Sequence, residues 1–221
     1  AFTRLEFLAV LAGLGLLMTV ALPLLAGLGP RSERVVCANN MRMISRAFSL
    51  WASTRDGVLP WQTYWPVGTQ GHMLFENAYY QYSMLSGLLE SPRILVDPGD
   101  NGPGIRVAKT WDNNPSGGLM ALSYGNNAIS YALAINASPL LPQSLILTDR
   151  NLQIASKAPG PFYFQRVSFI TPEAAAWTNA INGTQGNLAF MDGRVELADQ
   201  AVLRRAISWN TNWNGVFLFP F

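Results

Sequence analysis

The chain has 221 residues, a formal net charge of +2, and only 13% charged against 49% apolar residues. So small a positive charge gives no electrostatic footprint for nucleic acid or for an acidic partner. Cys37 is the only cysteine of the chain, so an intramolecular disulfide is excluded. Such a low content of charged residues is more typical of a protein whose surface is covered by neighbouring molecules than of a free soluble monomer.

The first part of the chain is apolar. No charged residue lies between Phe7 and Gly29, and a helix over this run is roughly 35 Å long, which exceeds a bilayer core of ~30 Å. Glu6 lies at the edge of the run, where a carboxylate is costly unless a cation meets it. The nearest cation is the α-amino group of the same chain or of a neighbouring copy. The pattern predicts subunits that pair charges inside an apolar helix bundle.

This start resembles the mature N-terminus of type IV pilins and of type II secretion pseudopilins. The residues that carry the resemblance are Phe2, Thr3, Leu5 and Glu6, followed by the apolar run and by Pro23. The alternative interpretation is an ordinary signal anchor or signal peptide. A signal peptide, however, has an apolar core of roughly 7–15 residues and a small-residue cleavage site, and this run is longer without such a site.

Two residues depart from the family pattern. Arg4 stands where an apolar residue is usual. In the family the leader is cut just before the Phe, so either Phe2 or Ala1 is the mature N-terminus, and Ala1 would place Glu6 one position further in. The resemblance implies an α+β pilin fold, in which a long N-terminal helix, kinked or partly melted near Pro23, packs on an antiparallel sheet.

The apolar run leads into an amphipathic helix that closes at Asp56-Gly57. Its apolar positions recur at three- and four-residue steps: Val36, Met43, Ile44, Ala47, Leu50 and Trp51. Pro23 removes a backbone donor, so the first helix should kink or unwind just before it, with a break or bend near residues 27–30. We expect three parts: an apolar assembly or transmembrane half (1–30), an amphipathic half (31–56) and a β-rich head (57–221).

The head has short apolar runs between turns. We expect helical turns over 81–90, a strand near 93–97, a helix over 198–208, and strands within 123–133, 145–149, 160–170 and 186–197. Asp192-Gly193 between two apolar runs predicts a hairpin turn. Residues 216–221 carry no charge and three phenylalanines, so they should bury against the head or a neighbouring subunit.

A second, looser resemblance covers residues 120–197. The runs SYGNNAISYAL, LILTDR and GNLAFMDGRVEL follow the order found in pilin-like proteins common in planctomycetes and verrucomicrobia. In those proteins a histidine precedes an Asp-Gly pair by nine residues, and the pair is usually followed by His-Val. Here Asp192-Gly193 is present, but Asn182 and Arg194 replace both histidines.

Catalytic groups are scarce. His72 is the only histidine and makes no zinc site without further ligands nearby in sequence. The run Asp97–Asn101 has oxygen ligands for calcium but lacks the spacing of a dedicated loop, so turn chemistry explains it better. Asn182-Gly-Thr184 matches a glycan acceptor, and the tryptophans should serve the core or subunit contacts rather than stack on sugars. We predict no catalytic residue, no metal and no cofactor.

The sequence thus favours a structural subunit, not an enzyme, that homopolymerises through its N-terminal helix into an extracellular pilus-like filament. The assembly residues are Ala1, Phe2, Arg4, Glu6 and Pro23. The expected partners are further copies, the inner membrane before assembly, a prepilin peptidase and a pilus assembly machinery, with no nucleic acid. The alternatives are a pseudopilin in a periplasmic pseudopilus and a monomeric membrane-anchored domain that binds carbohydrate.

Overall fold

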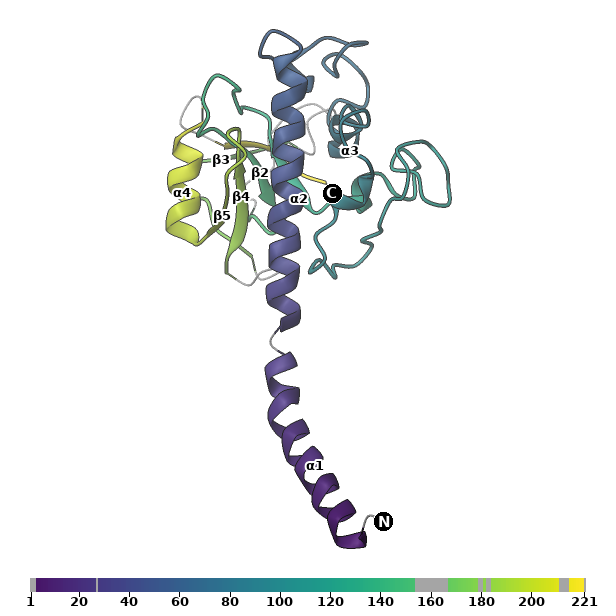
Figure 1. The fold of residues 1–221 in the computed structure, drawn as a ribbon. Helices are drawn as coiled ribbons and strands as arrows, with labels where there is room; N and C mark the ends of the chain where they lie inside the picture. Colours follow the sequence, from purple (N-terminus) through teal and green to yellow (C-terminus); the bar gives the residue numbers. More distant parts are fainter. Residues whose placement is uncertain are drawn as a thin grey trace.

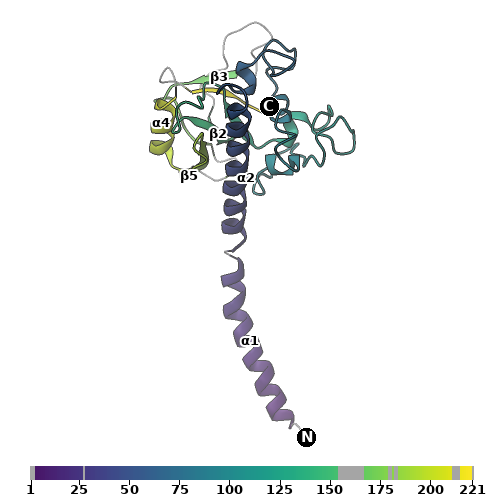
Figure 2. The same ribbon diagram turned by 45° about the horizontal axis from the view of Figure 1, so that its top comes forward.

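The computed structural model describes residues 3–26, 28–153, 167–178, 181, 184–210 and 215–220. Two consecutive helices form a stalk that enters a head of mixed helices and strands (Figure 1). Helix α1 (Arg4–Ala26) extends away from the head, and helix α2 (Leu28–Ser53) runs through it. The turned view in Figure 2 shows the same separation between α1 and the head. The fold class is therefore α+β, as predicted.

The two stalk helices cover the region in which the sequence predicts a kink or break, and Gly27 between them lies outside the described residues. Helix α1 continues through Pro23 to Ala26, and α2 begins at Leu28. The sequence predicted that the helix kinks or unwinds just before Pro23; unwinding is wrong, since the helical assignment is continuous there, and the kink stays a prediction. Within the described residues no helix is both long and apolar enough to cross a membrane. The membrane-spanning segment expected from the sequence stays a prediction.

The end of α2 follows its turn residues. Asp56 (φ 53°) and Gly57 (φ 74°) both adopt the left-handed conformation, and the Gly57 N–H donates to the Ala52 carbonyl at 3.0 Å. This contact satisfies one of the carbonyls that a helix leaves free at its C-terminus. The predicted closure at Asp56-Gly57 is confirmed.

The head contains a six-stranded sheet in which every neighbouring pair is antiparallel, with the strand order β3-β6-β1-β2-β4-β5. The strands are β1 (Tyr131–Ala134), β2 (Leu145–Asp149), β3 (Val167–Ile170), β4 (Gly186–Phe190), β5 (Val195–Ala198) and β6 (Gly215–Leu218). The register pairs Tyr131 with Asp149 and Leu133 with Leu218. A register shift in β2 separates Leu145 from Leu147 where this strand meets β4.

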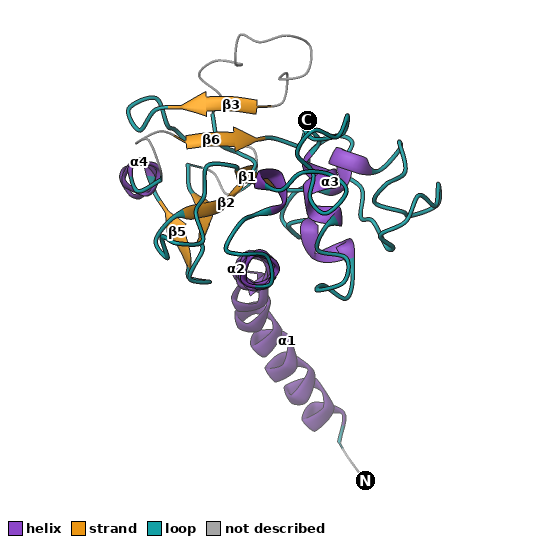
Figure 3. Ribbon diagram, turned by 90° about the horizontal axis from the view of Figure 1, so that it is seen from above, coloured by secondary structure: helices purple, strands orange, loops and turns teal. Residues whose placement is uncertain are grey.

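Both faces of the sheet are covered, which explains why β1, β2 and β4 are buried along their whole length. Helix α2 packs against β2, β4 and β5 on one face. Helix α4 (Gln200–Ser208) packs beside β5, away from α2 (Figure 3). Alternate residues of β1 therefore face two separate hydrophobic cores. Tyr131 and Leu133 belong to the core that includes the buried residues of α2, and Ala132 and Ala134 belong to the core that includes those of α4.

The sequence pattern predicted only some of the side chains that hold α2 against the sheet. Cys37, Met41 and Phe48 are fully buried on it, together with the expected Ile44, Ala47 and Trp51. Ser45 and Ser49 donate to the carbonyls of Phe190 and Met191, at 2.5 and 2.8 Å. Three other expected core positions are exposed, and they are Val36, Met43 and Leu50. The prediction of one apolar face is therefore corrected to two neighbouring stripes.

Several expectations for the head are confirmed and others are not. The strand over 145–149, the two strands within 186–197 and the helix within 198–208 are present as β2, β4, β5 and α4. The expected strand near 93–97 is wrong, because Pro92–Leu95 forms a 3-10 helix (η2). The expected helix over 81–90 is shorter and earlier, namely α3 (Ala78–Ser83).

Two further 3-10 helices complete the head, η1 (Pro60–Gln62) and η3 (Gly125–Ala128), and η3 replaces the first half of the strand expected over 123–133. The strand within 160–170 is described only as β3, since residues 154–166 lie outside the described part of the chain.

The C-terminal segment is part of the core. Strand β6 lies between β3 and β1, and Phe217, Leu218 and Phe219 are at most 1% exposed. Burial of each of these side chains contributes about 1.5–3 kcal/mol. The prediction that this segment buries is confirmed, and the surface that covers it is the head itself. Phe221 lies outside the described residues.

Candidate functional site

The first described residues form a hydrogen-bonded cap at the start of α1. The Thr3 N–H donates to Glu6 Oε2 at 2.8 Å, and the Glu6 N–H donates to Thr3 Oγ1 at 3.3 Å. This reciprocal pair is a capping box, in which two otherwise free helix N–H groups are satisfied. Glu6 therefore has a role within its own chain that sequence reasoning missed, although Thr-x-x-Glu is itself the signal for it.

Of the other predicted assembly residues, the structure describes Arg4 and Pro23 but not Ala1 and Phe2. Arg4 is exposed on the first turn of α1, and Arg4 and Glu6 form no ion pair within the described residues. Pro23 lies inside α1. Ala1 and Phe2 lie outside the described residues, so the structure does not test which of them pairs with Glu6.

Helix α1 presents its apolar side chains to solvent. The large exposed ones are Phe7, Leu8, Val10, Leu11, Leu14, Leu16, Leu17 and Met18. Continuous exposed apolar surface of this extent marks a contact with another molecule or a membrane. In the single chain this surface is uncovered, as the projecting stalk in Figures 1 and 2 illustrates.

Helix α2 exposes an apolar stripe of its own. Val36, Met43 and Leu50 recur every seven residues, so they lie along one side of the helix. Met43 and Leu50 also line a groove of about 360 Å³ whose other wall includes Leu88 and Ile94. We call Val36, Met43 and Leu50 the α2 stripe.

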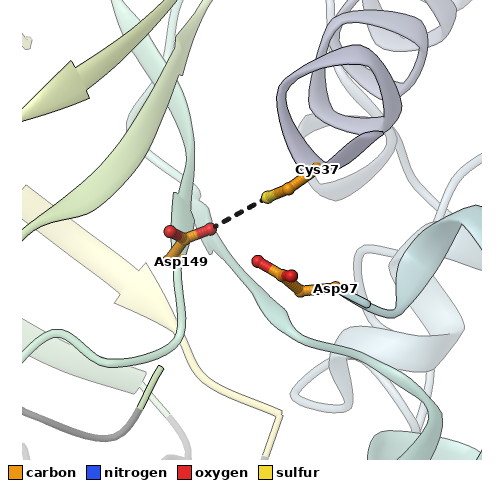
Figure 4. A group of neighbouring side chains, drawn as sticks. All are labelled: Cys37, Asp97 and Asp149. Carbon is orange, nitrogen blue, oxygen red and sulfur yellow. Dashed lines mark hydrogen bonds between the residues drawn. The ribbon is translucent and has the colours of Figure 1, made fainter. Parts of the chain in front are cut away.

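A second candidate site is a buried polar cluster formed by Cys37, Asp97 and Asp149 (Figure 4). Cys37 is on α2, Asp97 follows η2, and Asp149 ends β2. One ligand atom from each residue lies within 4.8 Å of the other two. The Cys37 thiol donates to Asp149 Oδ1 at 3.7 Å.

Two neighbouring side chains hold this cluster. Asn187 donates to Asp149 Oδ2 through its backbone N–H at 2.7 Å and through Nδ2 at 3.0 Å. Asn187 Nδ2 also lies 3.3 Å from Cys37 Sγ, and the Tyr131 hydroxyl donates to the same sulfur at 3.6 Å. Burial, reinforced by the charges of Asp149 and Asp97, raises the pKa of the Cys37 thiol.

Only one local feature of the chain points to this cluster, the carboxylate at the end of the apolar strand Leu145–Asp149. The three residues come from segments far apart in the chain, so no spacing motif connects them. Sequence reasoning left Cys37 without a role and considered Asp97 only as part of a calcium loop.

The two carboxylates of the Asp97–Asn101 loop do not converge on one position at which they could bind the same ion. Asp97 points into the buried cluster (Figure 4). Asp100 instead forms a two-pronged ion pair with Arg150, at 2.6 and 2.7 Å, and accepts a hydrogen bond from Ser130 Oγ at 2.7 Å. Asp97 and Asp100 also accept backbone N–H bonds from Gly99 and Gly102, which is turn chemistry as predicted.

His72 has a structural environment. Its ring stacks on Tyr80 with centroids 4.6 Å apart, and its Nδ1 accepts the Leu74 N–H at 3.1 Å. Among the described tryptophans, Trp51, Trp61 and Trp177 are buried and Trp65 is the most exposed.

The turn at Asp192-Gly193 is present, with Gly193 in the left-handed conformation (φ 82°). Arg194, which stands at one of the two positions where the resembling proteins have histidine, lies over the Phe190 ring at 3.9 Å and pairs with Glu196. Asn182 and Gly183, at the other histidine position and in the glycan acceptor pattern, lie outside the described residues.

Comparison of the chain with family models, with curated proteins and with solved structures returns no match.

Proposed function

We propose that this protein is a structural subunit that polymerises through its N-terminal helix into a pilus-like filament with a pilin fold. The observation that carries the proposal is α1, which extends from the head with its large apolar side chains exposed. Covering each such side chain contributes about 1.5–3 kcal/mol, so the eight together favour association strongly. Further copies of the same helix match this surface in length and chemistry.

The α2 stripe supports the same proposal. It is an apolar line at seven-residue spacing on a helix whose other side is fixed to the sheet, and such spacing suits contact with a second helix. Together α1 and the α2 stripe place exposed apolar side chains on both helices of the stalk. A copy displaced along the filament axis would cover them.

Glu6 would set the axial register of the filament. Inside a bundle of α1 helices a carboxylate is costly unless a cation meets it, and an N-terminal ammonium or Arg4 of a neighbouring subunit provides one. A subunit displaced by one step would leave two charges unpaired. Before assembly we propose a pool at the inner membrane that is processed by a prepilin peptidase, followed by an extracellular filament or a periplasmic pseudopilus.

One observation favours a second function, that of a monomeric membrane-anchored domain that binds carbohydrate. Tyr64 and Trp65 are adjacent and 72% and 57% exposed, and exposed aromatic rings suit stacking on sugars. The filament is preferred because this pair is a small surface compared with the uncovered stalk.

The test compares two leucine-to-aspartate variants in cells that produce the protein. Leu16→Asp places a charge in the α1 surface, and Leu122→Asp is the matched control on a fully exposed loop of the head. Sheared surface material is examined by negative-stain microscopy and immunoblotting. We expect wild-type and Leu122→Asp fibres, and a loss of more than about tenfold with Leu16→Asp, since a charge in an apolar bundle costs ~2.5 kcal/mol or more. The absence of fibres containing wild-type protein would contradict the proposal.

A further inference from the structure

Asp97 carries a buried oxygen atom without a partner. The residue is 3% exposed, and its Oδ1 accepts the Gly99 N–H at 2.7 Å. Its Oδ2 accepts no hydrogen bond within the described residues, and no cationic side chain pairs with Asp97 there. A carboxylate buried in this way is strongly unfavourable unless a positive charge meets it. Figure 4 shows its carboxylate directed at Cys37 and Asp149.

The sulfur of Cys37 is approached by two hydrogen-bond donors. Asn187 Nδ2 lies at 3.3 Å and the Tyr131 hydroxyl at 3.6 Å. A neutral thiol is a weak acceptor, and the same two donors would stabilise the thiolate that forms when a metal ion displaces the thiol proton. Asn187 also fixes Asp149 through two hydrogen bonds to Oδ2. Neighbours that orient ligands in this way surround most protein metal sites.

The spacing of the cluster fits a metal ion. In a tetrahedral zinc site with Zn–S near 2.3 Å and Zn–O near 2.1 Å, a sulfur and an oxygen ligand lie about 3.6 Å apart. Cys37 Sγ and Asp149 Oδ1 are 3.7 Å apart, and one ligand atom of Asp97 lies within 4.8 Å of both. A small approach of Asp97 would complete the set of three ligands.

We propose that Cys37, Asp97 and Asp149 bind a single divalent transition-metal ion, with zinc as the ion that best fits the ligands. The donor set decides the class of metal, because a thiolate disfavours magnesium and calcium, whereas zinc binds both thiolate and carboxylate ligands. Three protein ligands leave the fourth tetrahedral position open. The ion would join α2, the loop after η2 and the end of β2 at one point inside the head.

An acidic side chain lies beside the loop that carries Asp97. Glu33 is exposed on α2, one turn before Cys37, and a Cβ placed on Gly99 would lie 3.6 Å from Glu33 Oε2. A negative group at this position raises the local concentration of cations.

The test uses the full chain in detergent, stripped with a chelator and then dialysed against Zn²⁺ or Co²⁺. We compare wild type with Asp97→Asn, with Cys37→Ser, and with Asp112→Asn, an exposed carboxylate that serves as the matched control. Wild type and Asp112→Asn should bind one equivalent of Zn²⁺ by elemental analysis. Asp97→Asn should lose roughly 100-fold or more in affinity, because loss of even an outer-shell partner costs about 10–100-fold.

Two further readouts keep the proposal falsifiable if a variant is unstable. Co²⁺ should give wild type a sulfur-to-metal charge-transfer band that Cys37→Ser lacks, and Zn²⁺ should raise the melting temperature of wild type but not of Asp97→Asn. Folded wild type that binds no metal would overturn the proposal. Equal affinities of Asp97→Asn and Asp112→Asn would overturn it too. A third contradictory result is an Asp97→Asn protein that is more stable than wild type with and without Zn²⁺, which would mean that the cluster holds a proton instead.

Discussion

Replacing Glu6 by Gln removes one charge from the start of α1 and leaves the length and acceptor oxygen of the side chain unchanged. Within one chain the effect should be small. A Gln oxygen can still accept the Thr3 N–H that Glu6 accepts at 2.8 Å, and Thr3 Oγ1 still accepts the N–H of residue 6. Only the attraction between a carboxylate and the helix N-terminus is lost, about 0.3–1 kcal/mol.

Between chains the effect should be large if Glu6 pairs with a cation of a neighbouring subunit. Removal of one partner from a buried ion pair costs about 3–5 kcal/mol. This corresponds to roughly a 10²–10⁴-fold weaker association at each interface, because every 1.4 kcal/mol is a factor of ten. The helix cap and the ion pair therefore predict effects of different size for the same substitution.

The assay measures the yield of sheared fibres, normalised to the amount of subunit in the membrane fraction. Thr3→Val is the matched control, because it removes the hydroxyl of the capping box and keeps the Glu6 charge. We expect Thr3→Val to lose only about 1 kcal/mol of helix stability and to keep most of its fibres, whereas Glu6→Gln loses nearly all of them. Arg4→Leu reports the partner, since a loss with this variant assigns the pairing to Arg4 rather than to the terminal amine.

One pattern of fibre yields would refute charge pairing at Glu6. If Glu6→Gln assembles like wild type while Thr3→Val and Glu6→Ala do not, Glu6 acts only as the cap of its own helix. The proposed register by charge pairing then has no basis, although the apolar contacts of α1 would remain.

Three further predictions concern the head. Asp100→Ala should lower the free energy of unfolding by about 3–5 kcal/mol in a denaturant titration, because it leaves the Arg150 guanidinium unpaired; a change below 1 kcal/mol would contradict this. Deletion of residues 216–221 should abolish folding of the head, seen as lost thermal cooperativity, since β6 lies inside the sheet. Cooperative melting of the truncated chain would refute it. Gly193→Ala should cost about 1–2 kcal/mol, because alanine is strained at a φ of 82°, and an unchanged midpoint would show that the turn adapts.

The sequence predicted the parts of the head whose signals are local. Asp192-Gly193 between apolar runs identified the β4–β5 hairpin, and the strand over Leu145–Asp149 was bounded correctly as β2. The strand predicted after Pro92 is wrong, because the prediction rested only on the apolar residues Ile94 and Leu95. The proline instead begins a 3-10 helix, which Ser91 caps through Arg93 N–H.

Periodicity also could not separate the two apolar stripes of α2. Val36, Met43 and Leu50 lie close to Ile44, Ala47 and Trp51 around the helix, and a period near 3.6 assigns them all to one side. Only the position of the sheet decides which stripe is buried. The apolar residues left over are then informative, since they mark the side of the helix on which another molecule is expected.

The buried cluster was missed for a similar reason, since its partners are joined by the fold rather than by spacing. The order of the strands brings Asp149 to α2, and the turn at Asp97 places a third ligand opposite both. Helix α2 thus carries both the core residues and Cys37 of the cluster on its buried side, and the exposed stripe lies next to them. Because α2 also forms part of the stalk, a metal ion at Cys37 would join this helix to the end of β2 and to the loop after η2.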